Sequence, residues 1–175
     1  TAVIQPNAAW SDTMAPQIAQ ALQDVTGVTT VVLNGQGRAR SLEGLDERTE
    51  VSVGTAPTAP IEVPMNGALY MADVMGGQKT GLFYDQRPNH AFAQRLVDGG
   101  RVLDVFSHVG GFGLAMLAAG ADHATCIDGS EPALALARKG AEAMGKADQM
   151  DTRREDAFAA LEALAAEGAQ FDVVI

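Results

Sequence analysis

A short apolar run, a glycine-rich turn and a helical pattern follow one another in residues 101–120, and this succession restricts the fold more than any other part of the chain. Residues 102–105 are typical of a buried strand. Gly110, Gly111 and Gly113 remove side chains where the backbone must turn sharply or approach a ligand. A strand that runs into a glycine turn and a helix N-terminus is a place where open α/β sheets bind nucleotide-like ligands.

Beyond residue 100 the hydrophobic pattern alternates between short apolar runs and stretches with helical spacing. This alternation predicts a parallel sheet, joined by right-handed crossovers and covered by helices on both faces. We therefore predict an α/β fold for residues 76–175. The expected strands are 102–106, 123–127, 149–154 and 171–175, and the expected helices are 111–119, 131–144 and 157–167.

Residues 1–75 have a different pattern and predict a small α+β unit ahead of this fold. Apolar residues recur at three- and four-residue steps up to Gly27, which predicts a helix, and residues 28–33 predict a strand. Asn66-Gly67 joins two apolar runs and predicts a β-hairpin. The remaining expectations are irregular backbone in 1–10, loops or extended chain in 36–60, and a helix at 88–97 with Phe92 and Leu96 facing inward.

Composition limits the classes of protein to which the chain can belong. Hydrophobic residues make up 47% of the 175 residues, which suffices for a core, and no apolar run is long enough to span a bilayer. The net charge of −10 weighs against binding nucleic acid through electrostatics alone. Because Cys126 is the only cysteine, we expect no internal disulfide, a cytoplasmic setting and a buried core position for it. Since the chain begins with Thr1 and ends inside an expected strand, we expect a piece of a longer protein.

Three ligands compete for the glycine turn. A dinucleotide site has the pattern G-x-G-x-x-G; Gly111 and Gly113 begin it, but Met116 stands at its third glycine. A phosphate-binding P-loop ends in Gly-Lys followed by Ser or Thr, whereas Gln78 precedes Lys79 here. S-adenosylmethionine (SAM) has no phosphate, and needs a bare stretch of backbone, an acceptor for two ribose hydroxyls and an apolar place for adenine. We interpret the turn as a SAM site.

Acids at the ends of three successive expected strands support this interpretation. Asp128 follows the second strand, where a carboxylate can accept from both ribose hydroxyls. Asp156 follows the third strand and is placed to accept from the adenine amino group, with Phe158 nearby as an apolar face. Asp104, at the mouth of the first strand, can attract the ammonium of the methionine end. The alternatives are that Asp128 only marks a helix start and that Asp156 only caps a helix.

The three histidines show no metal-ligand spacing, and we expect no metal site. His108 lies in the turn and is a candidate for a polar contact with a ligand. We expect His90 and His123 at ordinary positions on the surface or at the ends of elements.

Four longer segments together resemble one known family. They are GQKTGLFYDQR at 77–87, VLDVFSHVGGFG at 102–113, DGSEPAL at 128–134 and FDVVI at 171–175. In this combination the chain resembles the SAM-dependent methyltransferases that modify cytosine C5 in large-subunit (23S) ribosomal RNA. The likeness is dense from about residue 60 to the end and looser before it.

The resemblance implies a class I methyltransferase fold, SAM as cofactor, ribosomal RNA as partner, no membrane association and a cytoplasmic location; a homodimer is compatible with it. The family's Gln-Lys-Thr-Gly segment folds over the methionine end of SAM, and we expect Lys79 or Arg87 to pair with the SAM carboxylate or with an RNA phosphate. The residues and the resemblance together predict cofactor contacts at Lys79, Thr80, Phe83, Arg87, Asp104, Phe106, Ser107, Gly110, Gly111, Gly113, Asp128, Gly129, Ser130, Asp156, Ala157 and Phe158.

The family also has an N-terminal PUA domain, an Asp-Pro-Pro motif and a catalytic cysteine that follows this motif. None of these lies in residues 1–175, so we assign no catalytic residue here and expect the chain by itself to be inactive. The implied chemistry is covalent: a thiolate adds to cytosine C6, C5 takes the methyl group from the sulfonium, and a base removes the C5 proton to release the enzyme. The alternatives are SAM-dependent methylation of a small molecule or protein, and a non-catalytic nucleotide-binding module.

Overall fold

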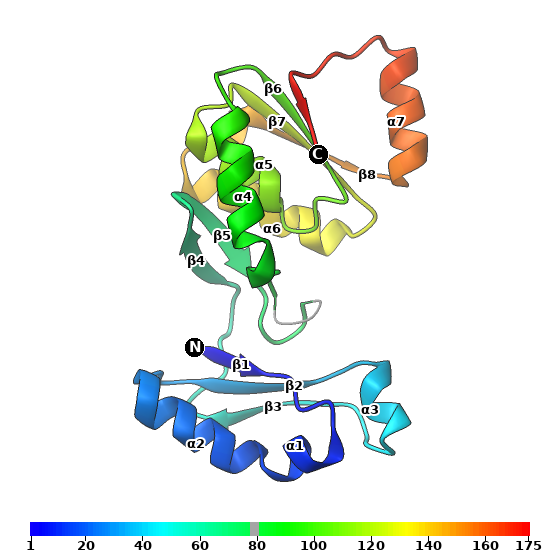
Figure 1. Ribbon diagram of the computed structural model, residues 1–175. Coiled ribbons are helices and arrows are strands. Elements are labelled where there is room, and N and C mark those ends of the chain that lie inside the picture. The colour runs from blue at the N-terminus through cyan, green and yellow to red at the C-terminus, as the bar shows by residue number, and fades with distance from the viewer. Residues whose placement is uncertain (78–80) are drawn as a thin grey trace. The chain divides into compact units, whose positions relative to one another are not determined.

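The computed structural model describes residues 1–77 and 81–175, and the chain forms two compact units (Figure 1). The first unit comprises Thr1–Ile61 and the described part of Asp73–Leu82. The second comprises Glu62–Ala72 and Phe83–Ile175. Among the described residues, no helix has both the length and the apolar character needed to cross a bilayer.

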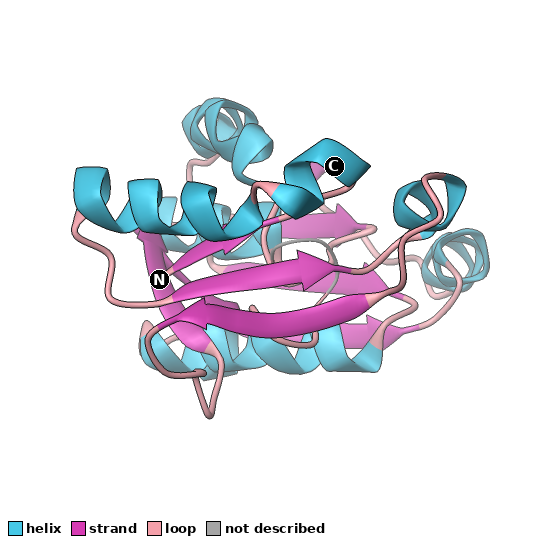
Figure 2. Ribbon diagram, turned by 90° about the horizontal axis from the view of Figure 1, so that it is seen from below, coloured by secondary structure: helices cyan, strands magenta, loops and turns pink. Residues whose placement is uncertain are grey.

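The first unit is a three-stranded sheet with helices packed against it. In strand order β1-β2-β3, β1 is parallel to β2, and β3 is antiparallel to β2. Figure 2 shows the long helix α2 running beside this sheet. The helix buries Ala15 and Ala19, and Gly27 ends it as predicted. The elements are β1 Ala2–Ile4, α1 Ala9–Thr13, α2 Ala15–Thr26, β2 Val31–Gly35, α3 Arg38–Leu42 and β3 Arg48–Val53.

Two predictions for this unit are wrong. Residues 1–10, expected to be irregular, contain β1 and the start of α1. Strand β1 forms because its three residues pair with Val31–Leu33, which their own sequence does not reveal. Residues 36–60 contain the unpredicted helix α3, whose Arg40 is 1% exposed. The Arg40 guanidinium donates to the carbonyls of Pro6 and Asp46 and pairs with Asp12. This long-range network stabilises a helix that is too short to be recognised from its own sequence.

The second unit is a four-stranded sheet in the order β8-β7-β6-β9, with every pair parallel. The predicted α/β fold is therefore confirmed. The main elements are β4 Ile61–Met65, β5 Ala68–Ala72, α4 Arg87–Ala93, β6 Arg101–Val105, α5 Gly111–Ala119, β7 His123–Asp128, α6 Glu131–Ala143, β8 Met150–Arg154, α7 Ala157–Ala166 and β9 Val173–Val174, and the 3-10 turns are 84–86, 94–96 and 147–149.

Helices cover both faces of this sheet, as expected from a parallel arrangement. Figure 1 shows α7 on one face and α5 and α6 on the other. Leu103 of β6 packs with Ile127 and Leu164 beneath α7. Its neighbour Asp104 points to the opposite face and contacts α5, because successive side chains of a strand alternate in direction.

The β4–β5 hairpin is joined at Asn66-Gly67 as predicted, and both residues have positive φ, 54° and 76°, as a type I′ turn requires. The pattern predicted this hairpin as part of the unit at 1–75, but the hairpin packs in the second unit, against α5 and α6. Tyr70 of β5 is fully buried, and its hydroxyl donates to the carbonyl of Gly111, 3.0 Å away.

The helix predicted at 88–97 has its inward face misassigned. Phe92 and Leu96 are 56% and 53% exposed, whereas His90 and Ala93 are buried. The α-helix α4 is only seven residues long and continues as a 3-10 turn, in which the spacing of residues around the axis changes. The two residues that face inward are therefore His90 and Ala93, which lie three positions apart. The expectation of a surface or element-end position for His90 is therefore wrong.

Candidate functional site

The loop between β6 and α5 is strained and firmly held at the carboxyl ends of β6 and β7. Phe106 and His108 have positive φ, 59° and 51°, which is costly for residues with a Cβ. Gly110 also has positive φ and is the N-cap of α5. The amide of Ser107 donates to the carbonyl of Ile127, and the amide of Gly110 donates to the carbonyl of Ser107. Such strain persists only where the surroundings impose it, and it is frequent at ligand sites.

Gly113 allows helix α5 to approach the sheet closely. A Cβ at this position would lie 2.6 Å from Cys126 Sγ and 3.5 Å from an oxygen of Asp104. Gly113 thus provides the close helix–strand packing that the dinucleotide pattern assigns to its third glycine, where this chain has buried Met116. Cys126 is fully buried, as predicted, and burial raises the pKa of its thiol.

Asp128, at the end of β7, ties the glycine loop to the start of α6. One carboxylate oxygen accepts from the amide of His108 and the other from the amide of Ser130, both at 2.8 Å. The Ser130 hydroxyl in turn accepts from the amide of Ala133 and caps α6. Asp128 therefore does have a structural role at the start of this helix. Each carboxylate oxygen of Asp128 can still accept a second hydrogen bond, and the residue is half-buried at the carboxyl end of β7. The arrangement therefore leaves Asp128 able to accept from a ligand.

Asp104 lies deeper than its predicted position at the mouth of the strand. It is 1% exposed, and its carboxylate accepts from the amide of Gly113 at 2.8 Å, under the N-terminus of α5. Burial raises its pKa to about 7, while the amide hydrogen bonds oppose this and the charge of Asp128 adds to it. The structure therefore places Asp104 beneath the glycine loop and not at the mouth of the strand.

Asp156 and Phe158 stand at the end of β8, beside the loop. Asp156 caps α7 by accepting from the amides of Phe158 and Ala159 at 3.0 and 3.1 Å. Phe158 is 70% exposed and Phe106 is 68% exposed, and their ring centroids are 6.4 Å apart. Two aromatic faces are thus presented to solvent at the carboxyl edge of the sheet.

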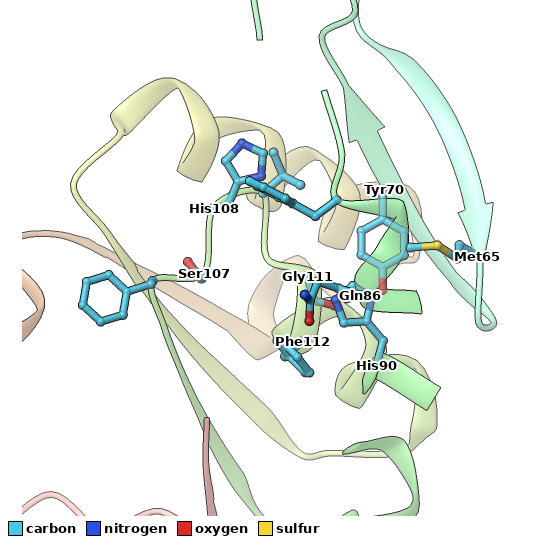
Figure 3. A pocket seen from close by; sticks show the side chains of 11 residues that line it. Met65, Tyr70, Gln86, His90, Ser107, His108, Gly111 and Phe112 are labelled. Atoms are coloured by element: carbon cyan, nitrogen blue, oxygen red, sulfur yellow. Dashed lines mark hydrogen bonds between the residues drawn. The ribbon is translucent and has the colours of Figure 1, made fainter. Parts of the chain in front are cut away.

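A pocket of about 100 Å³ opens beside the glycine loop (Figure 3). His108 packs edge-on against Phe83, with ring centroids 5.1 Å apart, and His90 packs edge-on against Phe112 at 4.6 Å. Burial lowers the pKa of both histidines. The lining residues are Met65, Tyr70, Phe83, Gln86, His90, Phe106, Ser107, His108, Val109, Gly111 and Phe112.

The structure brings most of the predicted contacts together around this loop. They are Phe83, Phe106, Ser107, Gly110, Gly111, Gly113, Asp128 and Ser130, with Phe158 beside Phe106. Gly129 is exposed, Ala157 is buried in α7, and Arg87 is exposed and does not line the pocket. Lys79 and Thr80 lie outside the described residues. Sequence reasoning missed His90 and Tyr70, although the three-residue step from His90 to Ala93 was available as a signal.

The sheet, the glycine loop and the acid at the end of β7 define the class I methyltransferase fold, and solved structures share it. A SAM-dependent methyltransferase from Agrobacterium tumefaciens has a TM-score of 0.69 at 18% identity and covers 87% of this chain and 47% of its own. The protein SMU.776, whose crystal structure contains S-adenosylhomocysteine (SAH), has a TM-score of 0.78 at 19% identity and covers 95% of this chain and 42% of its own. At these identities the likeness concerns the fold alone.

Sequence comparison places the chain in a family. The family described as "Conserved hypothetical protein 95" matches residues 87–175, and the chain belongs to it. Among curated relatives, the Ribosomal RNA large subunit methyltransferase I proteins of Aeromonas salmonicida and Aeromonas hydrophila are 36% and 37% identical over 160 and 161 residues. Each match covers 90% of this chain and 40% of the relative, so the chain spans about two fifths of these proteins.

Proposed function

We propose that this chain is the methyl-donor-binding part of a SAM-dependent methyltransferase that acts on large-subunit ribosomal RNA. The observation that carries the proposal is the position of Asp128, at the carboxyl end of β7 and hydrogen-bonded to the glycine loop through the amide of His108. The names of the relatives and the fold of its neighbours support the same conclusion.

The residues present fit SAM. The glycines at 110, 111 and 113 let the loop and the start of α5 pack closely against Ala137, His90 and Cys126, and this packing holds the loop beside Asp128. Asp128 has free acceptor sites for two ribose hydroxyls, and Phe106 and Phe158 offer exposed aromatic faces to adenine. When bound, SAM supplies a methyl group on a sulfonium, which leaves as a neutral thioether. The chain's own contribution is to bind and orient this donor and to exclude water.

The proposed acceptor is cytosine C5, which the motif resemblance supports. This chemistry needs a thiolate to add to C6. Cys126 does not meet this need, because it is fully buried under Gly113 and its raised pKa keeps the thiol protonated. In this proposal a cysteine outside residues 1–175 supplies the nucleophile.

The net charge of −10 favours one second candidate, a small-molecule or protein acceptor for the same methyl donor. The two candidates are separated by offering the full-length protein ribosomal RNA fragments that contain 5-fluorocytosine. Cytosine chemistry predicts a covalent protein–RNA adduct that depends on SAM, because fluorine at C5 cannot be removed as a proton. Absence of an adduct, together with methylation of another acceptor, would favour the second candidate.

Calorimetry on this chain tests donor binding directly. We expect SAM and SAH to bind and NAD not to bind. Asp128→Ala should weaken SAH binding by roughly 2–3 kcal/mol, or about 30- to 150-fold in Kd, because hydrogen bonds to a charged acceptor are lost. Asp98→Ala, which removes an exposed acid that does not line the pocket, is the matched control. Unchanged SAH affinity in a folded Asp128→Ala protein, or preferential binding of NAD, would contradict the proposal.

A further inference from the structure

Helix α4 and the 3-10 turns on either side of it carry large apolar side chains that face solvent. Tyr84, Phe92 and Leu96 are 51%, 56% and 53% exposed. The backbone at 84–96 is helical, and residues four positions apart on a helix are neighbours on its surface. With the exposed Pro88, these three side chains therefore form one continuous row along the helix, which we call the aromatic row. Contiguous apolar groups that face solvent mark an interaction surface.

A row that contains two arginines runs beside the aromatic row. Arg87 and Arg95 stand at four-residue steps with Ala91 between them, and all three residues are exposed. The Arg95 guanidinium carbon lies 5.3 Å from the centre of the Phe92 ring, which is the geometry of a cation–π contact. Neither arginine has an ion-pair partner among the described residues, whereas four other arginines of the chain are paired with acids. Both guanidinium groups are therefore available to an anion.

The charge of this helical segment differs from that of the chain as a whole. Residues 84–96 contain two arginines and one acid, Asp85, whereas the whole chain has 12 Lys and Arg against 22 Asp and Glu. Helical spacing places Asp85 and Asn89 on the other side of the aromatic row, away from the arginines. An anionic partner would therefore find its counter-charge along one side of this row, on a chain whose acidic surplus otherwise repels it.

Exposed rings beside unpaired arginines fit one kind of anion. The bases of a single-stranded nucleic acid stack on exposed aromatic rings, and its phosphates pair with neighbouring arginines. Stacking needs only an open ring face, which a row on the outside of a helix provides. A base-paired duplex does not offer its base faces in this way. The surface is therefore suited to single-stranded nucleic acid.

The segment lies next to the methyl-donor site. Figure 1 shows α4 beside α5, the helix that follows the glycine loop, and the two helices are in contact. Gln86, in the turn that leads into α4, lines the pocket beside this loop, whereas none of the residues of the aromatic row does. The outer face of the segment is thus about one helix diameter, roughly 10 Å, from the residues that border the donor site.

We propose that the aromatic row and the two arginines bind single-stranded RNA beside the nucleotide that receives the methyl group. Tyr84 and Phe92 stack on bases, and Arg87 and Arg95 pair with the phosphates that link these bases. The inference rests on the proposed function, in which RNA is the acceptor. It assigns Arg87 to an RNA phosphate and not to the SAM carboxylate, the two partners that the sequence leaves open for it.

The test is the fluorescence anisotropy of a short fluorescein-labelled oligouridylate, titrated with this chain saturated with SAH. We expect the single strand to bind. The same strand annealed to oligoadenylate should bind at least tenfold more weakly, because paired bases cannot stack on the rings. Repeating the titration at several salt concentrations gives the slope of log K against log salt, which measures the number of phosphate contacts.

Variants separate stacking from phosphate pairing. Phe92→Ala should raise the Kd about 5- to 150-fold, the loss of one stacked base, without altering the salt slope. Phe92→Tyr keeps a stacking ring and should bind as the unmodified chain does. Arg95→Gln should make the salt slope less steep by about 0.7, the contribution of one phosphate contact on a single strand. Val25→Ala and Arg38→Gln, at an exposed apolar residue and an exposed arginine of the first unit, are the matched controls.

Four results would overturn the inference: no binding of the single strand, equal binding of strand and duplex, an unchanged Kd in Phe92→Ala, or an unchanged salt slope in Arg95→Gln. The competing occupant of the row is a second copy of the chain. Sedimentation velocity that finds a dimer, which Phe92→Ala dissociates, would assign the row to self-association and would also overturn the inference. The comparison of strand and duplex on the unmodified chain decides the question even where a variant does not fold.

Failure of this inference is distinguishable from failure of the proposed function. Calorimetry with SAH on each variant reports the donor site separately, and we expect unchanged SAH affinity throughout. If SAH binds and the oligouridylate does not, only the RNA surface is wrong, and the 5-fluorocytosine adduct still tests the acceptor. If SAH does not bind to the unmodified chain, the proposed function itself fails.

Discussion

Replacing Asp104 by asparagine tests whether the buried carboxyl beneath the glycine loop makes the stability of the chain depend on pH. The pKa of this buried carboxyl rises from its ordinary 3.8 to about 7. A raised carboxyl pKa means that the folded chain binds the proton more tightly than the unfolded chain. The associated stability is fully present below pH 3.8 and is lost as the pH rises through 7. At 1.36 kcal/mol per pKa unit, the linked loss is at most about 4 kcal/mol.

Asp104→Asn should remove this pH dependence. The asparagine oxygen can still accept from the amide of Gly113, and it does not ionise. We expect the free energy of unfolding of the unmodified chain to fall by several kcal/mol between pH 4 and pH 8 relative to that of the variant, so that the variant is favoured at pH 8. Asp98→Asn, at an exposed position in the same unit, is the matched control.

The assay is urea unfolding followed by circular dichroism at 222 nm, at several pH values. Trp10, the only tryptophan, lies in the first unit, so its fluorescence reports that unit separately. If Asp104→Asn and the unmodified chain lose stability in parallel between pH 4 and pH 8, the argument from the buried carboxyl is refuted.

Two further predictions concern close packing in each unit. Gly113→Ala should cost about 1–3 kcal/mol, because its Cβ would lie 2.6 Å from Cys126 Sγ, and adding Cys126→Ala should recover part of that loss in urea unfolding. No recovery would contradict this account of the contact. Arg40→Met should leave the buried carbonyl of Pro6 without its donor, at about 1–3 kcal/mol, should also remove the donor of the more exposed Asp46 carbonyl, and should lower the Trp10 unfolding midpoint. Arg48→Met leaves those carbonyl bonds intact and should cost less; an equal loss would contradict the reasoning.

The sequence predicts the parallel sheet and helices α5, α6 and α7 well because each of these elements carries its own signal. Helix α5 has the predicted bounds, and α6 begins at the predicted cap, Ser130, and ends within one residue of the prediction. Buried parallel strands give apolar runs, and glycines end the helices between them. These local patterns do not depend on distant residues.

The elements that sequence reasoning missed depend on contacts between distant residues. Strand β1 exists through pairing with β2, and α3 is stabilised by Arg40, whose partners lie 6 to 34 residues away. The site shows the same difference. Asp128 was identified from its place after a strand, whereas the burial of His90 depends on Tyr70 and Phe112, which come from separate parts of the chain. Periodicity in one segment does not contain that information.

The path of the chain between its two units has a practical consequence. Residues 62–72 belong with the second unit although residues on either side belong with the first. A protein shortened to begin at residue 76 would lack the hairpin and with it the Tyr70 hydroxyl bound to Gly111. It would expose apolar surface on α5 and α6 and would be prone to aggregate. Expression of the sheet alone should therefore start before β4, and the first unit is best produced with a short linker that replaces the excised hairpin.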